Sequence, residues 1–251
     1  MTPARNSPPG ILAIGAHPDD AEISCGGTLA LAARQGFHVS VLDLTKGELS
    51  TNGTVEERAE EAAEAARLLG VATRMNAGLP DGGIDAGNDE QARSVVRILR
   101  TLRPALLLTH APHDRHPDHV QASQLVDRAW YLAGLRQFRS EGEPCRAEGR
   151  YYFASRIGFA PTFVVDITST WEEKRRAILA HRTQVSRGSA SSPTPLNDPD
   201  FIQRSEARAR HFGSQIGVRY GEPFRSTEPI GFRSLDALFS TARPEPGSFT
   251  G

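Results

Sequence analysis

Two short stretches of this sequence concentrate side chains that can bind a metal ion and move a proton. The first, residues 16–22, holds His17 and the adjacent carboxylates Asp19 and Asp20. The second, residues 110–119, contains four histidines in ten positions. Imidazole and carboxylate groups are common ligands of zinc and other divalent ions. A helix cap alone would need one carboxylate and no histidine, so the two stretches together predict a metal centre.

Each stretch follows a short apolar run that is typical of a buried strand. Residues 11–14 lead into the first stretch, and residues 105–109 lead into the second. Such runs suit parallel strands covered on both faces, and open α/β sheets place their ligands at the carboxyl ends of these strands. Pro117 suits the first position of a new helix, on which His116 and His119 would share one face. We therefore expect both stretches at the same edge of one sheet.

Strand-like and helix-like segments alternate along the chain, which predicts βαβ units with right-handed crossovers. The expected strands lie at residues 11–14, 39–44, 72–76, 105–109, 151–154 and 162–167. The expected helices lie at residues 25–33, 55–69, 92–102, 117–132, 170–180 and 201–212. The fold class is therefore α/β, with a mostly parallel sheet, helices on both of its faces and a C-terminal extension. Residues 187–198, within a polar connection at 183–198, are expected to form a long loop that could act as a mobile lid.

Length and composition narrow the classes of protein further. The chain has 251 residues and neither an internal repeat nor a convincing linker, so we expect a single domain at 11–235 between flexible tails at 1–10 and 236–251. The net charge of −1 gives no bulk attraction to nucleic acid or to anionic lipid. No apolar run reaches the roughly 18 residues of a membrane span, and the first ten residues lack the apolar core of a signal peptide. The two cysteines are too few for a disulfide framework, so a cytoplasmic location is expected.

The candidate metal ligands are His17, Asp20 and His119. Two imidazoles and one carboxylate leave one coordination position open, which is the pattern of a catalytic zinc site rather than a structural one. Zinc lowers the pKa of its bound water to about 7 and so supplies hydroxide at neutral pH. The same donor set also suits Fe(II) or Co(II).

Three neighbouring side chains could complete a hydrolytic site. Asp19 can lie against the water rather than the metal and act as general base. His116 is placed to stabilise a developing oxyanion or to protonate a leaving amine. Asp118 could orient one of the histidines. These parts suit the hydrolysis of an amide or an ester.

The two motifs, at residues 16–22 and 115–119, resemble those of the LmbE-like, or PIG-L, zinc de-N-acetylases. The resemblance implies a Rossmann-like α/β fold and deacetylation of N-acetylglucosamine groups. Residues 44–58, 79–82 and 211–224 are similar to the bacterial subgroup that deacetylates N-acetylglucosaminyl-malate in bacillithiol synthesis. The resemblance covers about residues 10–235.

The resemblance also implies roles for individual residues. His17, Asp20 and His119 would hold zinc, one ion per chain, while Asp19 would be the base and His116 its acid or electrostatic partner. The substrate contacts would be Arg58, Tyr220 and Arg115, the last of which could face a carboxylate or a hydroxyl. From its position alone, Arg58 is either solvated or held for a ligand, because a cation in the first turn of a helix is disfavoured. The resemblance further implies a homo-oligomer, a trimer or a hexamer.

One residue departs from the family pattern. His113 stands where a small or basic residue is expected, and it could offer an alternative ligand.

Three alternatives can be compared with the sequence. The substrate could be another N-acetylglucosaminide, such as a chitooligosaccharide or an inositol glycoside. A nucleotide-binding module would need a glycine-rich first turn, which residues 15–20 do not provide. A metal-binding protein without turnover would use His17, Asp20 and His119 but would not need Asp19 or His116.

Overall fold

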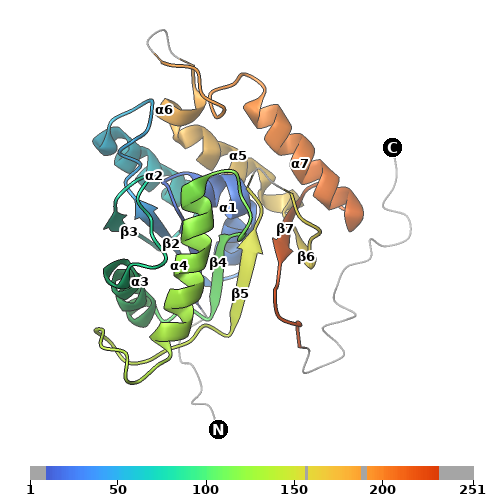
Figure 1. Ribbon diagram of the computed structural model, residues 1–251. Coiled ribbons are helices and arrows are strands. Elements are labelled where there is room, and N and C mark those ends of the chain that lie inside the picture. The colour runs from blue at the N-terminus through green and yellow to red at the C-terminus, as the bar shows by residue number, and fades with distance from the viewer. Residues whose placement is uncertain (1–9, 156–157, 188–190, 232–251) are drawn as a thin grey trace.

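The computed structural model describes residues 10–155, 158–187 and 191–231, and one seven-stranded sheet runs through them in the order β3-β2-β1-β4-β5-β7-β6 (Figure 1). The strands are β1 (Gly10–Gly15), β2 (His38–Thr45), β3 (Thr73–Leu79), β4 (Leu106–His110), β5 (Gly149–Phe153), β6 (Phe163–Asp166) and β7 (Gly221–Arg225). The first five strands pair in parallel, while β7 runs antiparallel to both β5 and β6. The predicted α/β class with a mostly parallel sheet is confirmed.

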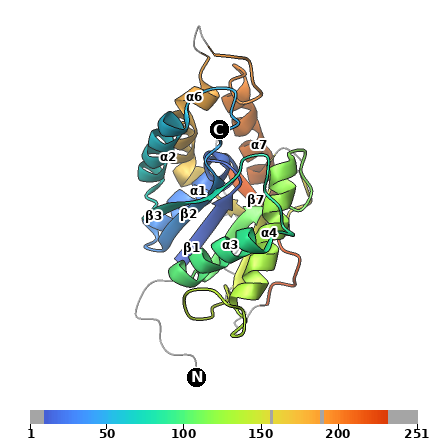
Figure 2. The ribbon, with the colours of Figure 1, turned by 60° about the vertical axis from the view of Figure 1, so that its left-hand side comes forward.

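Helices cover both faces of the sheet (Figure 2). The helices are α1 (Asp20–Arg34), α2 (Val55–Leu69), α3 (Asp89–Leu102), α4 (Pro117–Ala133), α5 (Trp171–Ala180), α6 (Arg182–Val185) and α7 (Phe201–Gln215), and a short 3-10 turn, η1, spans Thr168–Thr170. Alternate residues of β1 point to opposite faces, as the pleat requires. Leu12 and Ile14 pack under α3 and α4, whereas Ile11 and Ala13 pack under α1, α2 and α5. Both faces of β1 are therefore buried.

Helix α1 begins earlier than expected. The sequence predicted a start near Cys25, but the first turn is already helical at Asp20, and Cys25 marks a kink with φ −139° and ψ 17°. The second half of the helix receives a cap from β7, because the Glu222 carboxylate accepts hydrogen bonds from the backbone N–H groups of Gly27 at 2.9 Å and Thr28 at 2.7 Å. The kink lets one continuous segment present two helix N-termini.

Strand β7 was not expected from the sequence, because glycine, glutamate and proline favour strands weakly. Its pairing explains how Pro223 is tolerated. Within β7, only Phe224 and Arg225 pair with β5, so Pro223 lies beyond that ladder. The remaining predicted strands and helices are present, with ends shifted by a few residues.

Several other predictions concern the ends and loops of the chain. Of the predicted tail at 1–10, residues 1–9 lie outside the described residues, while Gly10 is the first residue of β1. The predicted tail at 236–251 and residues 188–190 of the predicted lid also lie outside them. The start of the connection at 183–198 is helical as part of α6, and Ser192 is bonded to Asn52 through both its backbone N–H and its carbonyl. Among the described helices, none combines the length and apolar character that a membrane crossing requires.

Candidate metal centre

The turn that leaves β1 places two carboxylates at the carboxyl edge of the sheet. The backbone N–H of His17 donates to Asp20 Oδ2 at 2.8 Å, which closes the turn on the first residue of α1. Asp19 precedes the helix with φ 142°, a backbone conformation that residues other than glycine rarely adopt. Asp19 and Asp20 are both buried. Such strain at a buried carboxylate is typical of a functional site.

Ligand-type atoms from the two predicted stretches converge beside this turn. Donor atoms of His17, Asp20 and His119 all lie within 4.8 Å of one another. Asp20 Oδ1 lies 3.2 Å from His119 Nε2, and Asp20 Oδ2 lies 3.5 Å from His17 Nδ1. Bonds of about 2.0–2.1 Å to a tetrahedral zinc would place neighbouring ligand atoms about 3.3 Å apart. The three residues therefore fit a divalent ion by both donor type and spacing.

Strong electrostatic coupling holds this cluster together. Burial works against a charged His17, but hydrogen bonds to Asp118, Asp20 and Asp81 outweigh it and raise the pKa of His17 to about 12. Burial also favours a protonated Asp20, yet His119 and the neighbouring His110 hold its pKa well below the usual range. The three carboxylates around the imidazole of His17 thus favour positive charge at this point of the structure.

The outward-facing nitrogen of each predicted histidine ligand meets a further carboxylate. His17 Nε2 lies 3.2 Å from Asp81 Oδ1 and 3.4 Å from Asp118 Oδ2. His119 Nδ1 lies 3.4 Å from Asp114 Oδ1. Carboxylates that contact a metal-ligating histidine fix its tautomer and its ring orientation. Asp118 thus lies where it can orient His17, as the sequence allowed.

Asp81 and Asp114 were missed as site residues. Each lies in a loop at the expected ligand edge, Asp81 in the turn at 80–83 and Asp114 inside the histidine-rich stretch. Their position in these loops was the only signal by which the sequence could have indicated them as site residues. The sequence could not show which ring nitrogen each carboxylate would face.

Arg58 contacts the candidate base. Its guanidinium donates to the carbonyl oxygens of Gly47 at 3.0 Å and Pro18 at 2.9 Å, and its Nη2 lies 3.4 Å from Asp19 Oδ2. The side chain is 4% exposed, so the expectation of a solvated Arg58 is wrong. Burial raises the pKa of Asp19 to about 6, and the positive charge of Arg58 opposes that rise. In this structure Arg58 is occupied by the protein itself, which gives its predicted substrate contact no support.

The helix α4 begins at the exposed side of the site. The ring of His116 accepts a hydrogen bond at Nδ1 from the backbone N–H of Asp118 at 3.3 Å, which makes His116 the N-cap. The ring stacks on His119 at a centroid distance of 4.7 Å. His113, Arg115 and His116 are all exposed. Because the cap occupies Nδ1, the Nε2 atom of His116 remains for chemistry.

A fourth histidine, His110, was not predicted as a site residue. It is fully buried at the end of β4 and stacks on His119 at a centroid distance of 4.0 Å. Its Nε2 accepts the backbone N–H of Ala16 at 3.0 Å and lies 3.2 Å from Asp20 Oδ2. Burial lowers the pKa of His110, and the carboxylate of Asp20 opposes that change. His110, which belongs to the second stretch, therefore contacts both the backbone and a carboxylate of the first stretch.

Tyr220 lies in a different environment from the one predicted. It is 5% exposed and stacks on Trp171 at a centroid distance of 4.7 Å. Its hydroxyl donates to Glu206 at 2.8 Å and accepts from Arg210 at 3.1 Å. These contacts are those of a packed side chain, and they give the predicted substrate contact no support.

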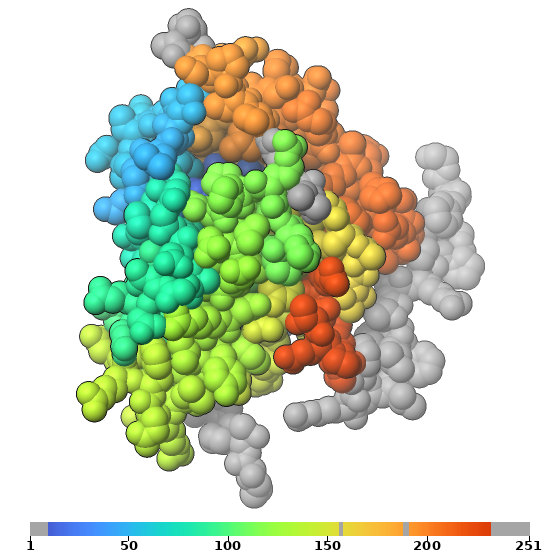
Figure 3. Space-filling model, viewed as in Figure 1, coloured from blue at the N-terminus to red at the C-terminus, as the bar shows by residue number. Residues whose placement is uncertain are grey.

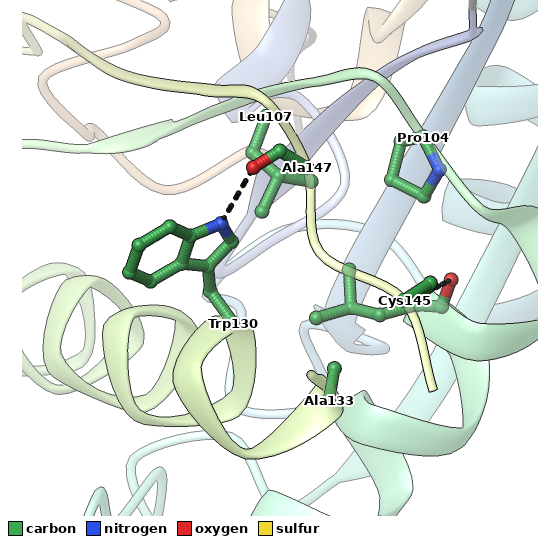
Figure 4. Close-up of a pocket in the computed structure, with 7 residues that line it drawn as sticks. Pro104, Leu107, Trp130, Ala133, Cys145 and Ala147 are labelled. Atoms are coloured by element: carbon green, nitrogen blue, oxygen red, sulfur yellow. Dashed lines mark hydrogen bonds between the residues drawn. The ribbon is translucent and has the colours of Figure 1, made fainter. Parts of the chain in front are cut away.

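The space-filling view shows where the site opens (Figure 3). The dark blue β1–α1 region is visible at the floor of a hollow between the lighter blue segment around residue 50, the green start of α4 and the orange segment that follows α6. A second, small cavity lies at the amino end of β4, where Trp130 Nε1 donates to the Ala147 carbonyl at 3.1 Å (Figure 4). Its lining is almost entirely apolar and includes Leu107 and Cys145. It has none of the ligand-type groups of the hollow.

Comparisons with known proteins agree with this geometry. Residues 12–130 match the model of the PIG-L family, described as GlcNAc-PI de-N-acetylase. The chain is 30% identical over 233 residues to the diacetylchitobiose deacetylase of Thermococcus kodakarensis, with 86% of this chain and 82% of that protein covered. The chain belongs to the PIG-L family of de-N-acetylases. It is therefore an enzyme that hydrolyses an amide bond.

Two further similarities are informative. The 1D-myo-inositol 2-acetamido-2-deoxy-α-D-glucopyranoside deacetylase of Rhodococcus jostii is 29% identical over 241 residues, which cover 70% of this chain and 82% of that protein. A crystal structure of a conserved protein from Thermus thermophilus is 40% identical, with a TM-score of 0.81 over 88% of this chain and 96% of that chain. The names of these two enzymes give different substrates, an inositol glycoside for one and diacetylchitobiose for the other.

Proposed function

We propose that this PIG-L enzyme uses one zinc ion, held by His17, Asp20 and His119, to remove the acetyl group from an N-acetylglucosaminide. The observation that carries the proposal is the convergence of these three donors within 4.8 Å beside the buried carboxylate of Asp19. Iron(II) or cobalt(II) would suit the same ligands. When bound, such an ion acidifies water and polarises the amide carbonyl.

Asp19 is the general base in this proposal. Its carboxylate adjoins the ligand Asp20, and Arg58 holds it in place at 3.4 Å. A pKa of about 6 keeps most of the group deprotonated at neutral pH while leaving it basic enough to accept a proton. The three hydrogen-bonding contacts of Arg58 fix the carboxylate at the turn, so the proton is received at a defined position.

His116 is the acid or electrostatic partner. The N-cap hydrogen bond fixes its ring, which is exposed and stacks on the predicted ligand His119. From there the ring can stabilise negative charge on the amide oxygen or give a proton to the departing amine. The carboxylate of Asp118 orients His17 by contact with Nε2 of that ring. The backbone N–H of Asp118 donates to His116 and so orients the second ring.

Within the N-acetylglucosaminides, we propose N-acetylglucosaminyl-malate as the preferred substrate. The similarity of residues 44–58, 79–82 and 211–224 to the bacillithiol subgroup supports this choice. Arg115 is exposed beside the histidine-rich stretch and can meet a carboxylate of malate. An inositol glycoside or diacetylchitobiose is the alternative, which the two named relatives favour.

Two further features stay predictions of the same kind. A cytoplasmic location is expected because the chain has only two cysteines, too few for a disulfide framework, which suits a reducing compartment. A trimer or hexamer would follow from the resemblance described above. Size-exclusion chromatography with light scattering measures the second directly.

The test combines metal analysis with a substrate panel. The purified protein should hold about one divalent ion per chain, lose activity on chelation and regain it when zinc is restored. Release of primary amine should then be compared for N-acetylglucosaminyl-malate, the inositol glycoside and diacetylchitobiose. Full activity in metal-free protein would contradict the metal proposal. Equal kcat/KM for all three substrates would remove the malate preference and keep the broader deacetylase.

A further inference from the structure

Helix α7 carries a half-buried arginine, Arg208, with one buried nitrogen that is unused. Arg208 donates through Nη1 to the carbonyl oxygen of Ser155, while its Nη2 is buried and has no hydrogen-bond partner among the described residues. Leaving a buried charged donor unpaired is costly, so native proteins rarely keep one without a function. The free nitrogen therefore indicates a place for a ligand.

Contacts connect Arg208 to the metal centre through two side chains. Ser155 follows β5 at the carboxyl edge of the sheet, and its hydroxyl donates to Asp114 Oδ2. The other oxygen of Asp114 lies 3.4 Å from Nδ1 of the predicted ligand His119. Arg208 is thus linked to the predicted ligand His119 through Ser155 and Asp114.

The neighbouring carboxylates are already committed to other groups. Burial lowers the pKa of Arg208, and the charges of Asp114 and Glu222 oppose that change. Asp114 accepts from Ser155 and from the backbone N–H of His116 at 2.9 Å. Glu222 caps the second half of α1 and binds Lys174 at 2.6 Å. Among the described residues, Arg208 forms no ion pair, so no carboxylate of these residues pairs with its charge.

We propose that Arg208 binds a carboxylate on the aglycone of the substrate and thereby selects an acidic N-acetylglucosaminide. The inference rests on the proposed function and deepens it. It adds Arg208 to the predicted substrate contacts in place of Arg58, whose two terminal nitrogens are taken up by Asp19 and two carbonyl groups. A guanidinium can meet a carboxylate with two parallel hydrogen bonds, and a neutral inositol or sugar offers no such partner.

The experiment compares an acidic and a neutral substrate in matched variants. Arg208→Met removes the charge at similar length, and Arg208→Lys retains it. The control is Arg204→Met, one turn earlier on the same helix, where the exposed Arg204 pairs with Asp198 at 3.0 Å. With N-acetylglucosaminyl-malate, Arg208→Met should lower kcat/KM about ten- to a hundred-fold, mainly through KM. With the methyl glycoside of N-acetylglucosamine, the same variant should stay within about twofold of wild type. Arg208→Lys should recover part of the loss, and Arg204→Met should match wild type on both substrates.

Two outcomes would overturn the inference. An equal loss on both substrates would show that Arg208 only holds Ser155 and Asp114 in position, and no loss on either would show that it is unused. If the wild-type enzyme releases amine from neither substrate, the proposed function fails separately. Calorimetric titration of the zinc-loaded protein with free malate then tests Arg208 without turnover: weaker binding in Arg208→Met supports the inference, and equal binding overturns it.

Discussion

The two loops that build the metal centre are constructed in opposite ways. The turn after β1 is closed, because Asp19 and Asp20 are buried and Arg58 and His110 contact them from below. The loop after β4 is open, because His113, Arg115 and His116 all face solvent. Both loops leave neighbouring parallel strands at the same edge of the sheet. Their difference therefore does not come from the fold but from what packs on each loop.

This contrast separates two tasks of the site. A buried turn in a low-dielectric environment can hold charges that would be solvated elsewhere, which suits metal binding and proton transfer. An exposed loop keeps its polar groups available to a substrate that arrives from water. We infer that changes in the closed turn affect metal and chemistry. In the open loop only His116 takes part in the chemistry, so changes at His113 or Arg115 affect substrate binding or nothing.

The largest effect is expected from Asp20→Ala. Asp20 contacts the rings of His17 and His119, and it also accepts the backbone N–H that closes the turn. Loss of a group that only orients a metal ligand typically costs about 10- to 100-fold in metal affinity, so loss of the ligand itself should cost more than about 100-fold. Metal content and amine release should both fall to background, as measured by elemental analysis and a deacetylation assay. Retention of a full complement of metal would exclude Asp20 from the ligand set.

Asp19→Ala should separate chemistry from metal binding within the same turn. The carboxylate adjoins the ligands but is placed here as the base, so the variant should keep its metal and lose about 10²- to 10⁴-fold in kcat. The comparison with Asp20→Ala controls for general damage to the turn. An Asp19→Ala protein that has also lost its metal would mean that both carboxylates serve as ligands.

Arg58→Met should shift the pH profile. Arg58 favours the charged form of Asp19, whose pKa burial has raised to about 6. Without the guanidinium the pKa of Asp19 should rise further, so the deprotonated base appears only at higher pH. The acid limb of kcat/KM should therefore move to higher pH, with a smaller loss at the alkaline plateau. An unshifted limb would show that Arg58 does not act through Asp19.

The sequence was sufficient to predict the parallel strands and a group of candidate metal ligands that converges at their ends, because both depend on local patterns. Short apolar runs marked the parallel strands, and the residues at their exits included His17, Asp20 and His119. The partners of these residues could not be read in the same way. His110 and Asp114 lie in the predicted stretch, yet their roles depend on which ring or carboxylate each one faces in three dimensions.

The errors have physical causes of the same kind. A helix N-terminus disfavours positive charge, so a solvated Arg58 was one of the two alternatives. The sequence alone could not show that the buried carboxylate of Asp19 lies beside that helix. Strand β7 contains Pro223 and was missed because intrinsic preference opposed it, while pairing with β6 on one side stabilises it. Contacts between distant segments decided each case.

The smallest effect is expected from His113→Ala, which tests an exposed histidine of the open loop that lies outside the cluster of candidate ligands. His113 could have been an alternative ligand, since it departs from the family pattern. The structure leaves it exposed, while the donors that converge within 4.8 Å are those of His17, Asp20 and His119. An exposed side chain without a place in that cluster should change neither stability nor metal content, so kcat/KM should stay within about twofold of wild type. Elemental analysis and kinetics on the same preparation make the comparison. A tenfold loss of activity together with lost metal would bring His113 into the site and show that the open loop closes on the ion.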